Sequence, residues 1–136
     1  MASRWIVGRS HYLDLAFHAW KQARQNEMVI RIEVPQDTQH AFDLGVLDGL
    51  NPTDGAMFVA FDERLGNFKR AELMQAAMER GFKLEPFIHS SAAIGAETVI
   101  GLNAFVGANV VIGHGCRIDY NTVIHASAHL GPACRV

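Results

Sequence analysis

An aliphatic residue stands at every sixth position of the last part of the chain, without a miss. This series is Ile88, Ile94, Ile100, Val106, Ile112, Ile118, Ile124, Leu130 and Val136. A six-residue period fits neither the turn of an α-helix nor the alternation of a β-strand. It does fit a solenoid, in which each short flat side of a coil carries one inward-facing aliphatic side chain. We therefore predict a hexapeptide-repeat parallel β-helix over residues 85–136.

Two further positions of the hexapeptide are restricted in size. The residue after the aliphatic is glycine in most repeats, at Gly95, Gly101, Gly107, Gly113 and Gly131. The exceptions are His89, Asp119 and His125. A small or compact residue stands two places before each later aliphatic, at Ala92, Thr98, Ala104, Val110, Cys116, Thr122, Ala128 and Cys134. Glycine after the aliphatic suits a tight corner, where a side chain would be a steric burden.

Residues 1–84 show a different pattern, in which short apolar runs alternate with helical periodicity. Strands are predicted at residues 4–7, 28–34 and 56–61, with residues 42–47 as an ambiguous fourth candidate and a turn over residues 51–55. Helices are predicted from the N-cap residue Ser10 to about Gln25, and from about Asn67 to Arg80 with Gly81 as the C′ residue. Their apolar faces are Leu13, Ala16, Phe17, Trp20 and Ala23 in the first helix, and Ala71, Met74, Ala77 and Met78 in the second. This alternation indicates a small parallel α/β domain.

The turn between the first strand and the first helix has the sequence Gly8-Arg9-Ser10-His11. A helix N-terminus after such a turn favours phosphate, because its amide groups are free and its dipole attracts negative charge. The turn has one glycine, whereas a dinucleotide-binding fingerprint has three. Two interpretations stay open: a phosphate-binding turn, and an ordinary turn whose serine caps the helix.

Composition and charge exclude several classes of protein. The formal net charge is −2 with both signs mixed, and no basic stripe indicates nucleic-acid binding. The N-terminus lacks the apolar stretch of a signal peptide, and no apolar run is long enough for a membrane span. We therefore expect a cytoplasmic protein that binds neither nucleic acid nor membrane. Cys116 and Cys134 form no disulfide framework, and we interpret them as core thiols of adjacent coils.

A resemblance to one family rests on a series of motifs in the middle of the chain. These are the strand Gly55–Phe61, Asn67 with Arg70, Arg80-Gly81-Phe82, and Phe87-Ile88-His89-Ser90-Ser91-Ala92. Together with the two predicted domains they resemble the NeuD and PglD type of sugar O-/N-acyltransferases. The resemblance implies a Rossmann-like domain over residues 1–84 that binds a free or nucleotide-linked sugar. It implies that residues 85–136 form a left-handed β-helix, in which three hexapeptides make one triangular coil and residues eighteen apart stack.

The resemblance also implies an activity and an assembly. Members transfer an acetyl group from acetyl-CoA to the amine or hydroxyl of a sugar, in the biosynthesis of surface polysaccharides or glycans. Their active sites lie between neighbouring subunits of a homotrimer. A histidine of the β-helix is the general base, a role that suits this side chain.

Individual site residues follow from the same resemblance. His114 and Cys116 match the family's His-Asp-Cys step, with Gly115 in place of the aspartate, so His114 is expected to be the catalytic base. His125 matches the histidine that lies near the thioester of acetyl-CoA. Gly8, Ser10 and His11 are expected to bind the sugar-nucleotide phosphate. His89 and His129 are interpreted as structural or surface residues.

Alternatives remain open. The first is a non-catalytic module, derived from such an enzyme, that binds a sugar nucleotide or only oligomerises. The second is a zinc protein of the γ-carbonic-anhydrase type, although no cysteine or carboxylate completes a set with His114, His125 and His129, so we expect no metal. The repeat covers about three coils, fewer than is usual in the family. We expect a truncated form of a longer enzyme, a short natural relative or a degenerate relative, and the retained His114 favours the first two.

Overall fold

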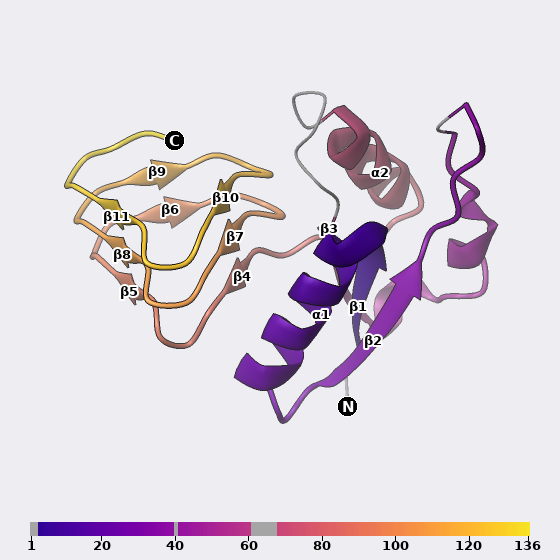
Figure 1. The fold of residues 1–136 in the computed structure, drawn as a ribbon, viewed down its shortest axis with the longest axis horizontal. Coiled ribbons are helices and arrows are strands. Elements are labelled where there is room, and N and C mark those ends of the chain that lie inside the picture. The colour runs from indigo at the N-terminus through magenta and orange to yellow at the C-terminus, as the bar shows by residue number, and fades with distance from the viewer. Residues whose placement is uncertain (1–2, 40, 61–67) are drawn as a thin grey trace. The chain divides into compact units, whose positions relative to one another are not determined.

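The computed structural model describes residues 3–39, 41–60 and 68–136, and the chain divides into two compact units, Met1–Leu84 and Glu85–Val136 (Figure 1). Phe61 and Asn67, which we predicted to end a strand and begin a helix, lie outside the described residues. No helix in the described part of the chain is long and apolar enough to cross a membrane.

The first unit is built on a parallel three-stranded sheet. Its strands β1 (Ser3–Gly8), β2 (Met28–Glu33) and β3 (Gly55–Ala60) lie in the order β2-β1-β3. Both neighbours of β1 run parallel to it, so the predicted parallel α/β arrangement is confirmed. The central position of β1 explains its apolar run, because a strand covered on both faces needs apolar side chains on both.

The helices α1 (Ser10–Ala23) and α2 (Phe68–Glu79) cover opposite faces of this sheet. Phe58 of β3 packs against Trp20 of α1, with 5.4 Å between the ring centroids. The neighbouring strand residues point the other way and share a core with α2: Trp5, Val7, Met57, Val59, Leu73, Met74 and Ala77. Gly81 follows α2 with φ +87°, which confirms it as the C′ residue.

The predictions for residues 42–47 and for Met78 are wrong. Residues 42–47 are not a strand, because the Asp43 side chain accepts a hydrogen bond from the Gly45 amide and caps a short 3₁₀ helix, η1 (Leu44–Leu47). Met78 does not face the core but is 49% exposed. The predicted turn over residues 51–55 contains another 3₁₀ helix, η2 (Pro52–Asp54), which the Asn51 side chain caps.

The end of α1 is tied to the start of the sheet by one carboxylate. Glu27 pairs with Arg4 of β1 at 3.2 Å and accepts a hydrogen bond of 2.9 Å from Trp20 Nε1. The Arg4 guanidinium also lies over the Trp20 ring, 4.8 Å from its centroid. Burial raises the pKa of Glu27, but the hydrogen bonds from Arg4 and Trp20 and the charges of Arg4 and Arg24 outweigh it, so this pKa is lowered from 4.5.

Replacing Glu27 by glutamine is expected to cost about 1.5–3 kcal/mol of stability at neutral pH, the usual range for hydrogen bonds to a charged group. A carboxyl whose pKa is lower in the folded state stabilises the fold above its unfolded pKa, and loses this effect as pH falls through the folded value. Urea unfolding at neutral and acidic pH should therefore show that the free energy of unfolding falls less on acidification in the variant than in wild type. Glu33→Gln, at an exposed position of β2, is the control and should leave the pH dependence unchanged. A Glu27 variant with the wild-type pH profile would contradict the prediction.

The second unit is a parallel β-helix of two-residue strands. In chain order these are β4 (Phe87–Ile88), β5 (Ala93–Ile94), β6 (Val99–Ile100), β7 (Phe105–Val106), β8 (Val111–Ile112), β9 (Arg117–Ile118), β10 (Val123–Ile124) and β11 (His129–Leu130). They form three parallel sheets, ordered β10-β7-β4, β11-β8-β5 and β6-β9. Val106 pairs with Ile88 below it and with Ile124 above it. Residues eighteen apart therefore stack, as predicted, and three strands make one turn of the coil seen in Figure 1.

The interior of this unit consists of the two predicted series of residues. The aliphatic series and the small residues form one core, of which Val106, Ile112, Ile118, Ala104 and Cys116 are fully enclosed. Val136 departs from the pattern at 44% exposed. Cys116 and Cys134 are free thiols in this core, and Cys116 Sγ donates to the Gly131 carbonyl at 3.1 Å.

Two features shape each corner: the glycine after the aliphatic residue, which we predicted, and a left-handed backbone two residues later, which we did not. The glycine after the aliphatic is required by stacking, since a Cβ on Gly95 would lie 2.6 Å from the Gly113 carbonyl carbon of the next coil. The left-handed backbone falls two residues later, with φ between 57° and 70°, at Glu97, Asn103, Asn109, Gly115, Asn121, Ser127 and Ala133. Two of these asparagines also stabilise the interior, because Asn103 Nδ2 donates to the Asn121 side chain at 3.3 Å and both are buried.

Candidate active site

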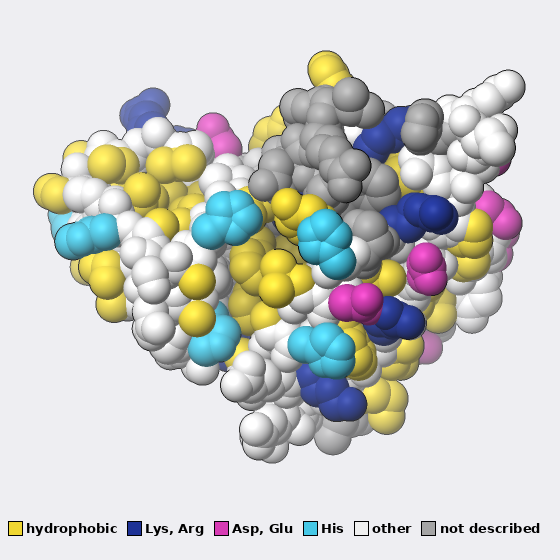
Figure 2. Space-filling view, in the orientation of Figure 1, with side chains coloured by type: hydrophobic (Ala, Val, Ile, Leu, Met, Phe, Trp, Pro, Cys, Tyr) yellow, Lys and Arg dark blue, Asp and Glu magenta, His cyan; other side chains and the backbone are white. Residues whose placement is uncertain are grey.

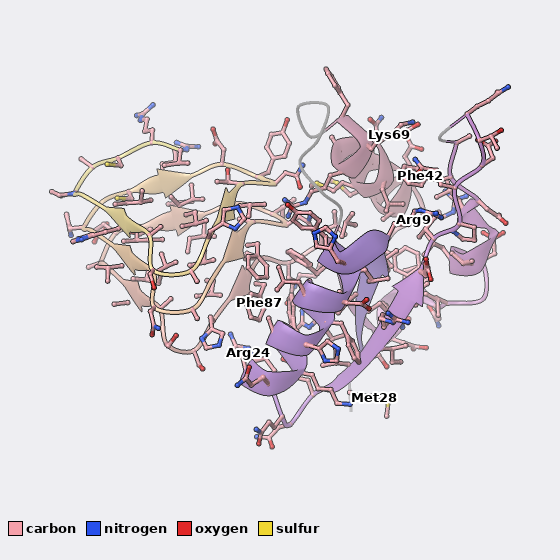
Figure 3. All side chains as sticks on the ribbon, in the orientation of Figure 1. Arg9, Arg24, Met28, Phe42, Lys69 and Phe87 are labelled. Atoms are coloured by element: carbon pink, nitrogen blue, oxygen red, sulfur yellow. The ribbon has the colours of Figure 1, made fainter. Side chains whose placement is uncertain are left out.

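The turn between β1 and α1 is tight and lies at the carboxyl end of the sheet, where Figure 3 shows Arg9. Gly8 has a structural reason to be glycine, because a Cβ there would lie 1.5 Å from the Ala60 carbonyl oxygen. The prediction that Ser10 is the N-cap is wrong. Arg9 takes that position, with extended φ −153° and ψ 159°, and α1 already begins at Ser10. The Ser10 side chain lies outside the described part of the structure.

Arg9 is a residue of this turn that the sequence analysis did not select. It provides no side-chain cap to the helix, and its Nη1 lies 3.5 Å from the Val34 carbonyl oxygen. Its guanidinium adds positive charge to this turn. The signal in the sequence was its place between Gly8 and Ser10.

His11 is exposed on the first turn of α1. Its ring lies 4.6 Å from that of Tyr12. It lines a shallow depression of about 470 Å³ along the helix, together with Asp14, Leu15, His18, Ala19 and Gln22. Asp14 pairs with Arg31 of β2. The structure thus brings Gly8, Arg9 and His11 together within one turn, with His11 accessible to a ligand.

His114 lies at the corner of the β-helix between β8 and β9. Its side chain is exposed, and its carbonyl oxygen accepts a hydrogen bond of 2.8 Å from the Ala133 amide in the next coil. Gly115, next to it, has φ +70°, and Cys116 is buried. A hydrogen bond to the next coil therefore fixes the backbone of this corner, and the imidazole points outward. Figure 2 shows histidine side chains at the surface of the protein.

His125 and His129 lie elsewhere on the coil. His125 follows β10, at the corner between β10 and β11, and His129 is the outward residue of β11; both are exposed. Stacked corners of this coil are eighteen residues apart, whereas His125 lies eleven residues after His114 and therefore at a different corner. A single chain therefore places the expected base and the expected acetyl-CoA contact at different corners.

A serine–histidine contact in the first coil is structural. Ser91 Oγ lies 2.8 Å from His89 Nδ1, but that nitrogen also accepts from the Ser91 amide at 3.1 Å. Ser91 Oγ in turn accepts a hydrogen bond of 2.9 Å from the Asn109 amide. The hydroxyl and imidazole thus join two stacked corners. Among the described residues, no three His, Cys, Asp or Glu side chains are grouped to hold a metal ion.

Buried Arg70 is another residue with a fixed role. It is 1% exposed, its Nε donates to the Val59 carbonyl at 3.3 Å, and its guanidinium lies 5.7 Å from the Phe58 ring centroid. These contacts attach the start of α2 to the end of β3. The place of Arg70 in the family motif is therefore explained by positioning this edge of the sheet.

Comparisons with known proteins gave matches among solved structures but none among family models or curated sequences. A scan against models of protein families found no match, and a search of curated proteins found none either. Solved structures do match. PerB from Caulobacter crescentus, in complex with CoA and GDP-perosamine, is 26% identical with a TM-score of 0.75, over 99% of this chain and 65% of that chain. A histidine-to-alanine mutant of GDP-perosamine N-acetyltransferase from the same organism is 25% identical with a TM-score of 0.54, over 99% of this chain and 68% of that chain.

A third match concerns the fold alone. The acetyltransferase domain of PglB from Neisseria gonorrhoeae, in complex with acetyl coenzyme A, is 21% identical with a TM-score of 0.54, over 97% of this chain and 72% of that chain. The fold is thus similar to that of hexapeptide-repeat acetyltransferases. The predicted resemblance to sugar acyltransferases is confirmed at the level of structure, and this chain spans 65% of the length of PerB.

Proposed function

We propose that this chain is an acetyl-CoA-dependent acetyltransferase that acts on the amine or hydroxyl of a nucleotide-linked sugar. The observation that carries the proposal is the similarity to PerB, which covers 99% of this chain and therefore both of its units. The first unit would be a Rossmann-like domain for the sugar nucleotide, and the second a left-handed β-helix for acetyl-CoA. The same proposal places the enzyme in the cytoplasm, within the biosynthesis of surface polysaccharides or glycans.

The turn after β1 suits the phosphate groups of the sugar nucleotide. Gly8 allows close approach of the backbone, and the first amides of α1 point out of the turn with the positive end of the helix dipole. Ser10 and His11 would donate further hydrogen bonds. Arg9 supplies a charge of the required sign.

His114 would act as the general base. Its imidazole takes the proton from the sugar amine or hydroxyl as that group attacks the thioester carbon. A nitrogen–carbon or oxygen–carbon bond forms, and an amide or hydroxyl donor stabilises the oxyanion. The carbon–sulfur bond then breaks, and the sulfur of CoA leaves with a proton. His125 would lie near the thioester as a hydrogen-bond donor.

A homotrimer is part of the proposal. His114 and His125 lie at different corners of one coil. A symmetric ring of three prisms would set one corner of each subunit against a different corner of its neighbour. That arrangement would give each site both histidines.

A non-catalytic module is the second candidate, and Gly115 favours it. The family carries an aspartate at this position, which would orient the imidazole, whereas glycine has no side chain to do so. Such a module would bind the sugar nucleotide through the first unit, without acetyl transfer.

Calorimetric titration with acetyl-CoA and with a panel of UDP- and GDP-linked amino sugars separates the two candidates. An enzyme should bind both classes of ligand and release the CoA thiol when both are present. Binding of a sugar nucleotide without acetyl-CoA would support the module. Failure to bind acetyl-CoA would contradict the proposed activity.

A further inference from the structure

Two arginines stack on the outer wall of the β-helix. Arg117 and Arg135 are eighteen apart and form an isolated parallel bridge. The Arg117 amide donates to the Cys134 carbonyl at 2.8 Å, and the Val136 amide donates to the Arg117 carbonyl at 2.9 Å. Both side chains point outward, since the neighbouring Cys116 and Ile118 are buried. Adjacent strands of a sheet lie about 4.8 Å apart, so the two guanidinium groups share one patch of surface.

This pair carries an unbalanced charge. Within residues 3–39, 41–60 and 68–136, neither arginine forms an ion pair. Asp119, the acidic residue nearest to Arg117 in sequence, pairs with neither. Like charges directly opposite one another destabilise a sheet. A bound anion would reverse this effect, because guanidinium groups bind phosphate oxygens through paired, charge-assisted hydrogen bonds.

The wall beside the pair is apolar and aromatic. Val99 belongs to the same column, one coil below Arg117, and is 59% exposed. Tyr120 is 66% exposed and Leu102 is 45% exposed. These two lie on adjacent coils of the next corner, where the Asn121 amide donates to the Leu102 carbonyl at 2.9 Å. An exposed aromatic ring next to an aliphatic side chain offers a stacking surface for a nucleotide base.

We infer that Arg117 and Arg135 bind the phosphate groups of a purine nucleotide, and that the adenosine bisphosphate part of acetyl-CoA is that nucleotide. The inference rests on the proposed function for the identity of the ligand, but not for the existence of the site. The GDP or UDP part of a sugar nucleotide has similar phosphate chemistry, so the test distinguishes the two sources.

Calorimetric titration of the full chain with adenosine 3′,5′-bisphosphate tests the site directly. Arg117→Gln and Arg135→Gln should each weaken binding at least tenfold, because one charge-assisted hydrogen bond is worth about 1.5–3 kcal/mol and about 1.4 kcal/mol is tenfold. Arg117→Lys should retain part of the affinity. Arg80→Gln, a half-exposed arginine of the other unit, is the control and should bind within twofold of wild type. Weaker binding at higher salt is expected as well.

The outcomes separate this inference from the proposed activity. Wild-type binding that the two glutamine variants lose supports the site, whether or not acetyl transfer is found. Equal affinity of wild type and variants for the bisphosphate, no binding to wild type, or a loss of GDP or UDP binding in place of bisphosphate binding in the two glutamine variants would overturn it. Acetyl-CoA binding that is unchanged in both variants would overturn it too, and would leave the proposed activity standing. Thermal melting without ligand checks the fold, and the variants should melt no lower than wild type because a repulsion is removed.

Discussion

Replacing His114 by alanine is expected to lower kcat for acetyl transfer by about 100- to 10,000-fold, the range in which a positioned general base contributes. Alanine cannot take a proton from the attacking amine or hydroxyl, so the neutral group must attack the thioester without a base to remove its proton. Binding should change little, because removal of a group that acts only in the transition state lowers kcat and not ground-state affinity. Steady-state release of the CoA thiol, with titration of acetyl-CoA into the variant, measures both quantities.

The structure supplies the matched control for this prediction. His129 is also an exposed histidine of the β-helix, on the outward side of β11, and His129→Ala should keep wild-type kcat. Neither substitution should disturb the fold, since His114 contributes to the stacked corner through its carbonyl oxygen, which alanine retains. Retention of full activity in His114→Ala, with melting unchanged, would remove His114 from the proposed mechanism.

The β-helix could be predicted from the sequence because each of its interior positions depends on one property. Ile112 and Ile118 must be apolar to fill the interior, and Cys116 must be compact to fit between them. The stacking of residues eighteen apart then follows from the resemblance and is what the strands show. Because buried positions recur every six residues, the apolar and compact residue types recur with the same period.

The left-handed positions left a weaker record, with asparagine or glycine at four of the seven. The residues that adopt this backbone include Glu97, Ser127 and Ala133 besides asparagine and glycine. A non-glycine residue there costs about 1–2 kcal/mol, which the stacked coils on either side can offset. Because the fold as a whole imposes the conformation, residue type alone does not mark it.

In the first unit, an apolar run predicted the wrong element, because a local hydrogen bond determines the backbone there. Residues 42–47 have the composition of a strand. The Asp43 carboxylate, however, accepts a hydrogen bond from the Gly45 amide and caps a short 3₁₀ helix. The same kind of side-chain contact makes the Asn51 turn, which was predicted. The difference is that a proline follows the capping residue of the second turn, whereas the segment 42–47 contains none, and only the sheet order β2-β1-β3 shows that this segment is not one of its strands.

The candidate site could be predicted only as separate residues. Sequence motifs select His114 and His125 one at a time. The number of residues between them, taken with the coil of eighteen, places them at different corners. Whether they act in one site depends on the proposed homotrimer, and contacts between subunits leave no period in the sequence of one chain.

Replacing Gly113 by alanine is expected to destabilise the β-helix by about 3 kcal/mol, at the upper end of the usual cost of overpacking. A Cβ at this position would lie 2.7 Å from the Pro132 nitrogen and 2.9 Å from the Gly131 carbonyl carbon. These atoms are backbone, so they cannot rotate away as the end of a flexible side chain would. The coils must move apart instead, which weakens the hydrogen bond of 2.9 Å from the Gly113 amide to the Leu130 carbonyl. Urea unfolding, followed by circular dichroism, measures the loss.

Gly131 is the matched control, because it stands one coil above Gly113 in the same column. A Cβ there has nothing within 4 Å, so Gly131→Ala should change stability by no more than about 0.5 kcal/mol. Neither glycine has a positive φ, and a difference between the two variants must therefore come from stacking and not from backbone conformation. Equal destabilisation by both substitutions would mean that the local structure of the corner, and not contact with the next coil, requires glycine. The close approach of successive coils would then no longer explain why glycine stands at this position in most repeats.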